Sequence, residues 1–206
     1  MTEKEVRLIL LNQLNFSQDA LYKLDVFCSE VINYNQKFNL ISKSTVNNIW
    51  ERHILDSAQL VKFINFDDGL SLSDLGTGAG FPGIVIAIYN KNIKFHVKLY
   101  DKSRVKTKFL ESLCKKLNIK ANIFENNYQN HQIDSYYVVS RAFKKLEEHI
   151  RISREIIKVN HKLIILKGRS AEEEIKKLNK DINYSYRLEK SITSPDSKIV
   201  IVEVKK

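Results

Sequence analysis

A glycine-rich stretch at residues 74–83 carries the clearest chemical signal in the sequence. Asp74 is followed by Gly76, Gly78, Gly80 and Gly83, four of the six glycines in the chain. Apolar residues precede the stretch and the aliphatic run 84–88 follows it, an order typical of a strand, a tight turn and a helix. Glycine permits positive φ and close approach to a ligand, and the helix aims its free N–H groups at the turn. The stretch therefore predicts a ligand-binding turn.

Two binding patterns fit this stretch, and a plain structural turn is the third interpretation. Asp74-x-Gly76-x-Gly78-x-Gly80 is the acidic pattern of class I S-adenosylmethionine (SAM) methyltransferases, whereas Gly78-x-Gly80-x-x-Gly83 satisfies the dinucleotide pattern. A carboxylate at the end of the strand can face the ammonium group of SAM, but it would repel a pyrophosphate. Asp74 therefore favours SAM.

The whole chain has a formal net charge of +10, and the positive charge is concentrated in its C-terminal two thirds. Residues 1–69 hold 7 Lys/Arg against 9 Asp/Glu, a net of −2, and residues 70–206 hold 27 against 15, a net of +12. A basic surface of this size favours a polyanion such as nucleic acid. Biased base composition is the alternative explanation, because the chain is also rich in Asn, Ile and Lys.

Other features bound the class of protein. No apolar run approaches the roughly 18 residues of a membrane span, and the first residues lack the layout of a signal peptide. Cys28 and Cys114 show no metal-type spacing, and the five histidines are scattered. We therefore expect a cytoplasmic protein with no membrane segment and no metal site.

The apolar pattern predicts a helical cap over residues 1–69, packed on an α/β domain over residues 70–206. From residue 70 strands alternate with helices, which is typical of a doubly wound, mostly parallel sheet, here of seven strands. We expect helices at 2–14, 17–38 and 45–64 in the cap and at 82–90, 103–117, 144–158 and 170–180 beyond it. We expect strands at 70–75, 94–100, 120–124, 136–140, 160–166, 184–190 and 197–204.

Ligand-type residues follow successive predicted strands, at the sheet edge where such folds bind ligands. Asp101, after the second strand, can accept both ribose hydroxyls, or it can cap the helix at 103–117. Asn127 and Tyr128 follow the third strand and suit the edge and face of an adenine. Arg141 follows the fourth strand and Lys167 the fifth.

Two groups of polar residues have both a functional and an ordinary interpretation. Arg52, His53 and Asp56 lie on the third predicted helix, where they either pair along a solvated face or contribute to the site. The segment 102–108 carries cations that either face solvent or contact phosphates. These cations are Lys102, Arg104, Lys106 and Lys108.

Taken together, several segments resemble one family, the bacterial small-subunit rRNA guanine-N7 methyltransferases RsmG, also called GidB. The matching segments span about residues 31–175 in the family's order. They are Asn35-x-x-Phe38-Asn39-Leu40, Arg52-His53-x-x-Asp56-Ser57, Asp74 to Gly83, Ser140-Arg141-Ala142-Phe143, and Lys167-Gly168 followed by Glu172-Glu173-Glu174-Ile175.

The resemblance implies a class I fold and methyl transfer from SAM, with S-adenosylhomocysteine as product, to N7 of one guanine in the 530 loop of 16S rRNA. The partner is 16S rRNA or the small ribosomal subunit, and we expect a monomer. By position, the family's SAM contacts fall on Gly76, Phe81, Asn127, Tyr128 and Arg141. Asp74 and Gly78 belong to the same motif, and Asp101 follows from the general class I pattern.

Guanine N7 carries a lone pair and no proton, so we expect no general base. Arg141 is expected to position ligand or base, and Asp56 to stabilise the charge that the ring gains. RNA contacts are expected from Arg52, His53, Lys167 and the cations of 102–108. Two other functions remain open: a non-catalytic RNA-binding or ribosome-assembly protein on this fold, and an NAD-linked oxidoreductase.

Overall fold

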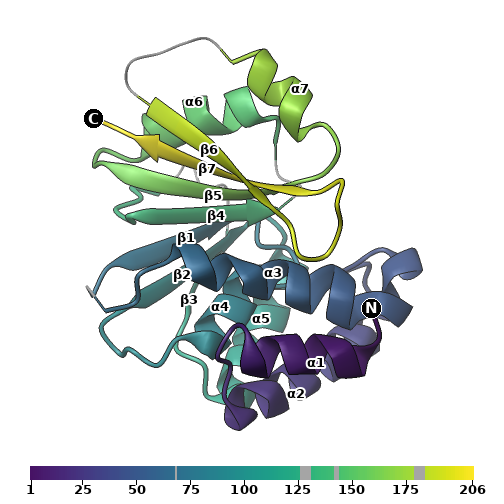
Figure 1. Ribbon diagram of the computed structural model, residues 1–206. Helices are drawn as coiled ribbons and strands as arrows, with labels where there is room; N and C mark the ends of the chain where they lie inside the picture. Colours follow the sequence, from purple (N-terminus) through teal and green to yellow (C-terminus); the bar gives the residue numbers. More distant parts are fainter. Residues whose placement is uncertain (68, 126–130, 142–143, 179–183) are drawn as a thin grey trace.

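The computed structural model describes residues 1–67, 69–125, 131–141, 144–178 and 184–206. At its centre lies a seven-stranded sheet with the order β3-β2-β1-β4-β5-β7-β6 (Figure 1). Neighbours from β3 to β5 pair in parallel, whereas β7 is antiparallel to both β5 and β6. The strands are β1 (Ser71–Leu75), β2 (His96–Asp101), β3 (Asn122–Glu125), β4 (Tyr137–Arg141), β5 (His161–Lys167), β6 (Tyr184–Lys190) and β7 (Lys198–Val204).

Helices cover both faces of the sheet. On one face α4 (Gly83–Tyr89) and α5 (Arg104–Leu117) join the larger apolar cluster, and α5 contributes Phe109, Leu110 and Leu113 to it. On the other face α6 (Leu146–Ile156) and α7 (Ala171–Lys176) form a second cluster with β4, β5 and β7. The predicted doubly wound sheet is confirmed, and each of its seven strands lies within two residues of its expected limits.

The N-terminal helices pack on the α4–α5 side of the sheet (Figure 1). They are α1 (Glu3–Asn12) and α2 (Gln18–Asn35), which begins at a Ser17 cap whose Oγ accepts a hydrogen bond from Ala20 N–H. Phe27 of α2 packs on Phe81 of the glycine turn, with ring centroids 4.8 Å apart. The helical cap therefore shares an apolar core with the sheet; its boundary at residue 69 stays a prediction.

The prediction of one α-helix over 45–64 is wrong in detail. The segment consists of a 3₁₀ turn η1 (Lys43–Asn48), a π-helical segment η2 (Trp50–Leu55), a short α3 (Asp56–Ala58) and a second 3₁₀ turn η3 (Gln59–Phe63). The apolar period predicts which side chains face inward, but it carries no signal for a local change of helical pitch. π-helical turns are frequent at functional sites, and this one holds Arg52 and His53.

Among the described residues, no helix combines the length and the apolar character needed to cross a membrane.

Replacement of Gly83 by alanine tests how tightly α4 packs on the sheet. A Cβ at this position would lie 2.2 Å from Leu99 Cδ2 and 2.7 Å from Asp74 Oδ2. We expect Gly83→Ala to lower the free energy of unfolding by about 1–3 kcal/mol, because the surrounding atoms must move. Gly168→Ala is the matched control, since a Cβ there meets nothing within 4 Å, and we expect a change within about 0.5 kcal/mol. Urea unfolding measures both, and equal losses would contradict the packing described here.

Candidate functional site

The turn after β1 has the conformation that its glycines predict. Gly76, Gly78 and Gly80 have φ values of 72°, 60° and 102°, a region that residues with a side chain rarely adopt. The end of β2 holds the turn in place, because Gly76 N and Thr77 N both donate to Tyr100 O, at 2.9 and 3.0 Å. The turn therefore presents its backbone at the carboxyl edge of the sheet, between β1 and α4.

Asp74 lies fully buried beneath this turn. Its Oδ2 accepts a hydrogen bond from Gly83 N–H at 2.8 Å, whereas its Oδ1 has no hydrogen-bond partner among the described residues. Burial raises the pKa of Asp74 to about 7, although the Gly83 N–H and the charge of Arg141 act to lower it. A buried carboxylate with one open acceptor oxygen fits the cationic ammonium group of a ligand such as SAM.

Asp101 connects the glycine turn to the start of α5. Its Oδ2 accepts from Gly78 N–H at 2.9 Å and its Oδ1 accepts from Ser103 N–H at 2.8 Å. The N-cap position of α5 is occupied by Ser103 and not by Asp101, and the Ser103 side chain makes no capping hydrogen bond. Each carboxylate oxygen retains a lone pair, so Asp101 can both fix the turn and accept a hydroxyl.

Arg141, at the end of β4, joins the sheet to the segment that begins with η2. Its Nη1 donates to Arg52 O at 2.9 Å and its Nη2 donates to His53 Nδ1 at 2.7 Å. Its guanidinium carbon lies 5.2 Å from the ring centroid of Phe81, in the glycine turn. A single side chain therefore contacts the turn, the sheet edge and residues 50–63, which we call the helical segment.

The tautomer of His53 follows from this arrangement. Arginine can only donate, so Nδ1 must accept, and the ring proton lies on Nε2, which donates to Thr45 Oγ1 at 2.8 Å. Burial, with smaller contributions from the charges of Arg141 and Arg52, lowers the pKa of His53 to about 3. His53 is therefore a neutral link whose lone pair is already engaged by Arg141.

A cleft of about 490 Å³ lies beside Arg141, and its described lining residues include none from the glycine turn. It is bounded by the helical segment, by the ends of β4 and β5, by the start of α7 and by the turn between β6 and β7. The described residues that line it are Thr45, Arg52, His53, Asp56, Arg141, Leu166, Lys167, Gly168, Ser170, Glu174, Thr193 and Ser197.

Lys167 is held inside the wall of this cleft. Its Nζ donates to Lys144 O at 2.6 Å and to Glu174 Oε2 at 2.7 Å. Burial acts to raise the pKa of Glu174, but hydrogen bonds from Lys167, Ser170 and Leu146 N–H lower it overall. This ion pair stiffens the junction between β5 and α7 beside the cleft.

The structure brings the predicted residues into two adjacent groups and one separate surface. Asp74, Gly76, Gly78, Phe81 and Asp101 surround the turn, and Lys106 joins them, since its Nζ lies 4.0 Å from the position of a Cβ on Gly78. Arg52, His53, Asp56, Arg141 and Lys167 line the cleft. Lys102, Arg104 and Lys108 are exposed around α5, and Asn127 and Tyr128 lie outside the described residues.

Sequence reasoning missed three polar residues of the cleft region. Thr193 Oγ1 donates to Asp56 Oδ1 at 2.9 Å, and the buried Gln59 donates to the same oxygen at 3.1 Å. Thr45 receives the Nε2 hydrogen bond of His53. Only Gln59 carried a signal, as a polar residue among the apolar positions of its helix, because the other two acquire their partners through tertiary contacts. In the described part of the chain, no group of His, Cys, Asp and Glu is arranged to hold a metal ion.

Asp74→Asn tests the open acceptor under the turn. In the wild type the raised pKa means that the folded state loses stability as pH rises from about 3.8 to about 7, whereas the amide does not titrate. We therefore expect the unfolding free energy of Asp74→Asn, relative to that of the wild type, to rise by on the order of 2 kcal/mol between pH 5 and pH 8. Affinity for SAM should fall at least about tenfold, because a charge-assisted hydrogen bond is lost. Chemical denaturation and calorimetric titration measure the two effects; parallel pH profiles for the two proteins would contradict the buried charge.

Comparisons with known proteins bear on the fold and on the family of this chain. The solved structure of a SAM-dependent methyltransferase from Aquifex aeolicus superposes with a TM-score of 0.61 at 13% identity, covering 84% of this chain and 98% of that one. Magnesium protoporphyrin IX methyltransferase from Synechocystis, solved with bound SAM, superposes with a TM-score of 0.59 at 16% identity, covering 92% and 98%. These likenesses establish the class I methyltransferase fold.

Sequence relatives establish the family. The family model GidB, rRNA small subunit methyltransferase G, matches residues 20–200. The ribosomal RNA small subunit methyltransferase G of Pelagibacter ubique is 34% identical over 203 residues, which cover 96% of this chain and 95% of that protein. The protein of the same name from Mycoplasma capricolum is 36% identical over 188 residues, which cover 87% and 80%. Because the family model and these relatives each match most of its length, the chain belongs to the rRNA small subunit methyltransferase G family.

Proposed function

We propose that this protein transfers the methyl group of SAM to N7 of one guanine in the 530 loop of 16S rRNA. The observation that carries the proposal is the position of Arg141, which contacts Phe81 of the glycine turn on one side and lines the cleft on the other. A cofactor held by the turn and a base held in the cleft would then meet at the end of β4. The names of the relatives support rRNA as the substrate.

On this proposal the turn holds SAM, which supplies a methyl group activated by its sulfonium. Asp74 Oδ1 would receive the ammonium group, and the backbone of Gly76 and Gly78 would form part of the same site. Asp101 would accept the ribose hydroxyls with its remaining lone pairs. Asn127 and Tyr128 contribute the adenine contacts that the family pattern implies, and they lie outside the described residues. Phe81 and Arg141 close the end nearest the cleft.

The chemistry in the cleft is positioning and charge stabilisation. Guanine N7 has a lone pair ready to attack, so the protein has no proton to remove. The arrangement of His53 suits this requirement, because its lone pair is occupied and its pKa is low. Asp56 supplies a negative charge next to the ring, which becomes positive as the methyl group is transferred.

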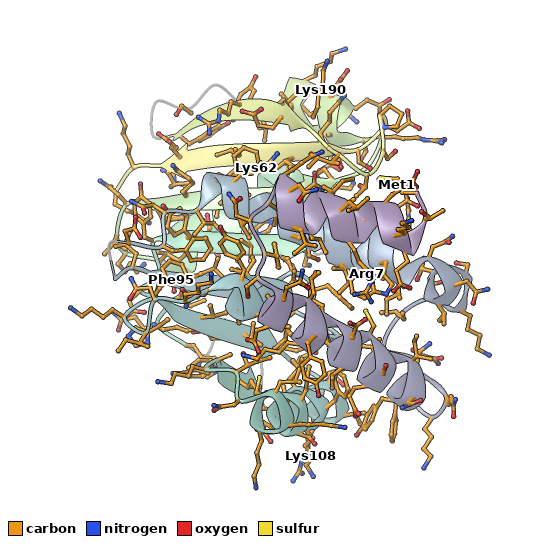
Figure 2. All side chains as sticks on the ribbon, turned by 60° about the horizontal axis from the view of Figure 1, so that its bottom comes forward. Met1, Arg7, Lys62, Phe95, Lys108 and Lys190 are labelled. Atoms are coloured by element: carbon orange, nitrogen blue, oxygen red, sulfur yellow. The ribbon has the colours of Figure 1, made fainter. Side chains whose placement is uncertain are left out.

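The RNA approaches from the exposed side of the cleft. Arg52 is exposed at the rim, and Lys102, Arg104 and Lys108 form a separate basic surface around α5, where Lys108 points away from the body of the protein (Figure 2). Phosphate contacts of this kind orient an RNA without reading its sequence. N7 lies in the deep groove of regular A-form RNA, so the target is a base unstacked from a loop. We further propose that the protein acts as a monomer, in the cytoplasm, on 16S rRNA or the small subunit.

Methyl transfer with identification of the product nucleoside tests the proposal. We expect labelled SAM to place one N7-methylguanosine in small subunits, or 16S rRNA, from cells lacking the activity. Arg141→Ala and Gly76→Asp should lower transfer at least about a hundredfold while the proteins remain folded, because the first removes the junction and the second fills the turn. Asp134→Asn, at an exposed ion pair with Lys98 near the start of β2, is the control. Another methylated nucleoside, or normal transfer by the folded Arg141→Ala protein, would contradict the assignment.

Two alternative functions predict different results in the same assays. A non-catalytic RNA-binding or ribosome-assembly protein would bind RNA regardless of SAM and would transfer no methyl group. An NAD-linked oxidoreductase would bind NAD(H) tightly, but the buried Asp74 carboxylate under the turn opposes a pyrophosphate.

A further inference from the structure

We infer that Asp56 reads the target base: its carboxylate accepts hydrogen bonds from the N1–H and the 2-amino group of the guanine whose N7 is methylated. This inference rests on the proposed function, and it assigns base selection to one residue of the cleft. It goes beyond the stabilisation of charge, because it concerns the edge of the base that lies opposite the imidazole ring.

The two oxygens of Asp56 have different surroundings. Oδ1 accepts from Gln59 Nε2 at 3.1 Å and from Thr193 Oγ1 at 2.9 Å. Oδ2 lies 3.8 Å from Arg141 Nη1, which is longer than a direct hydrogen bond. The side chain is 17% exposed, and it lines the cleft. One oxygen is therefore anchored inside the protein, while the other retains acceptor capacity beside the cleft.

The anchor itself is rigid. Gln59 is 1% exposed, and while its Nε2 donates to Asp56, its Oε1 accepts from Ile192 N–H at 2.8 Å. Thr193, which donates to the same oxygen of the carboxylate, belongs with Ile192 to the turn between β6 and β7. Asp56 is therefore held between its own helical segment and the C-terminal hairpin, and such preorganised groups discriminate between ligands most sharply.

The other charged side chains of the cleft cannot take this role. Among the described residues that line it, Asp56 and Glu174 carry the carboxylates, and Glu174 is occupied by Lys167, Ser170 and Leu146 N–H. Arg52, Arg141 and Lys167 can only donate. A guanine whose N7 points to the methyl donor still presents two donors, N1–H and the 2-amino group, and among the described lining residues Asp56 is the carboxylate with an oxygen available to accept from them.

Arg141 and Asp56, side by side in the cleft, match the order of hydrogen-bonding groups on guanine and exclude adenine. Guanine carries O6, an acceptor, next to N1–H, a donor; the wall carries Arg141, a donor, next to Asp56, an acceptor. Adenine presents the lone pair of N1 at the position of N1–H, which the carboxylate would repel. Methylation at N7 makes the ring positive and its N1–H more acidic, so this hydrogen bond strengthens during the reaction.

Inosine provides the direct test, because it keeps N7, O6 and N1–H but lacks the 2-amino group. We would reconstitute small subunits from ligated 16S rRNA that carries guanosine or inosine at the target position. For the wild type we expect kcat/KM to be about 10- to 100-fold higher with guanosine, the range for one hydrogen bond to a charged group. Asp56→Asn should reduce this ratio to below about threefold and should also slow transfer to guanosine.

Controls separate base reading from a loss of structure. Asp134→Asn should keep the wild-type ratio, and the dissociation constant of Asp56→Asn for SAM should stay within about twofold of the wild type. If Asp56→Asn does not fold, Thr193→Val, which removes one hydrogen bond that orients the carboxylate, should lower the ratio in part. A wild-type ratio near one, or an unchanged ratio in a folded Asp56→Asn or Thr193→Val protein, would overturn the inference alone. Failure of the wild type to methylate guanosine at N7 would overturn the proposed function as well.

Discussion

The structure depends most on the contacts of one guanidinium group, that of Arg141. It is tied to the backbone oxygen of Arg52 and to the ring of His53, and it lies over Phe81. Burial lowers the pKa of Arg141, and the charges of Asp56 and Asp74 act in the opposite direction, which keeps a buried cation tolerable. Because β4 is a central strand, this contact places the N-terminal helical segment against the sheet edge where the glycine turn lies.

Several groups around this contact are poorly satisfied by the protein alone. Asp74 Oδ1 is buried without a hydrogen-bond partner among the described residues, and so is the hydroxyl of Thr77 in the turn. Such atoms cost folding free energy, and a bound ligand is one group that can complete their bonding. The protein thus holds acceptors ready for a cation beneath the turn, while the cleft beyond Arg141 has a different, mixed lining of donors and acceptors.

The sequence predicted the edge of the sheet better than the segment that covers it. In a parallel sheet the residues that follow successive strands must meet, so Asp74, Asp101 and Arg141 could be assigned from strand positions alone. The π and 3₁₀ turns of 43–63 and the contact between Asp56 and Thr193, 137 residues apart, have no local signature. The charge of a residue does not show whether its side chain is already paired. We expected Lys167 to contact RNA, but its ammonium group donates a hydrogen bond to Glu174.

Nitrogen-15 NMR of the His53 ring shows whether Arg141 holds that ring as a neutral, fixed link. Comparison with the spectrum of a His53→Asn protein assigns the signals. We expect a proton on Nε2, a lone pair on Nδ1 and no titration between pH 8 and pH 5, since the pKa of His53 lies near 3. A proton on Nδ1, or a titration near the ordinary histidine pKa of about 6.5, would show that Arg141 does not hold this ring.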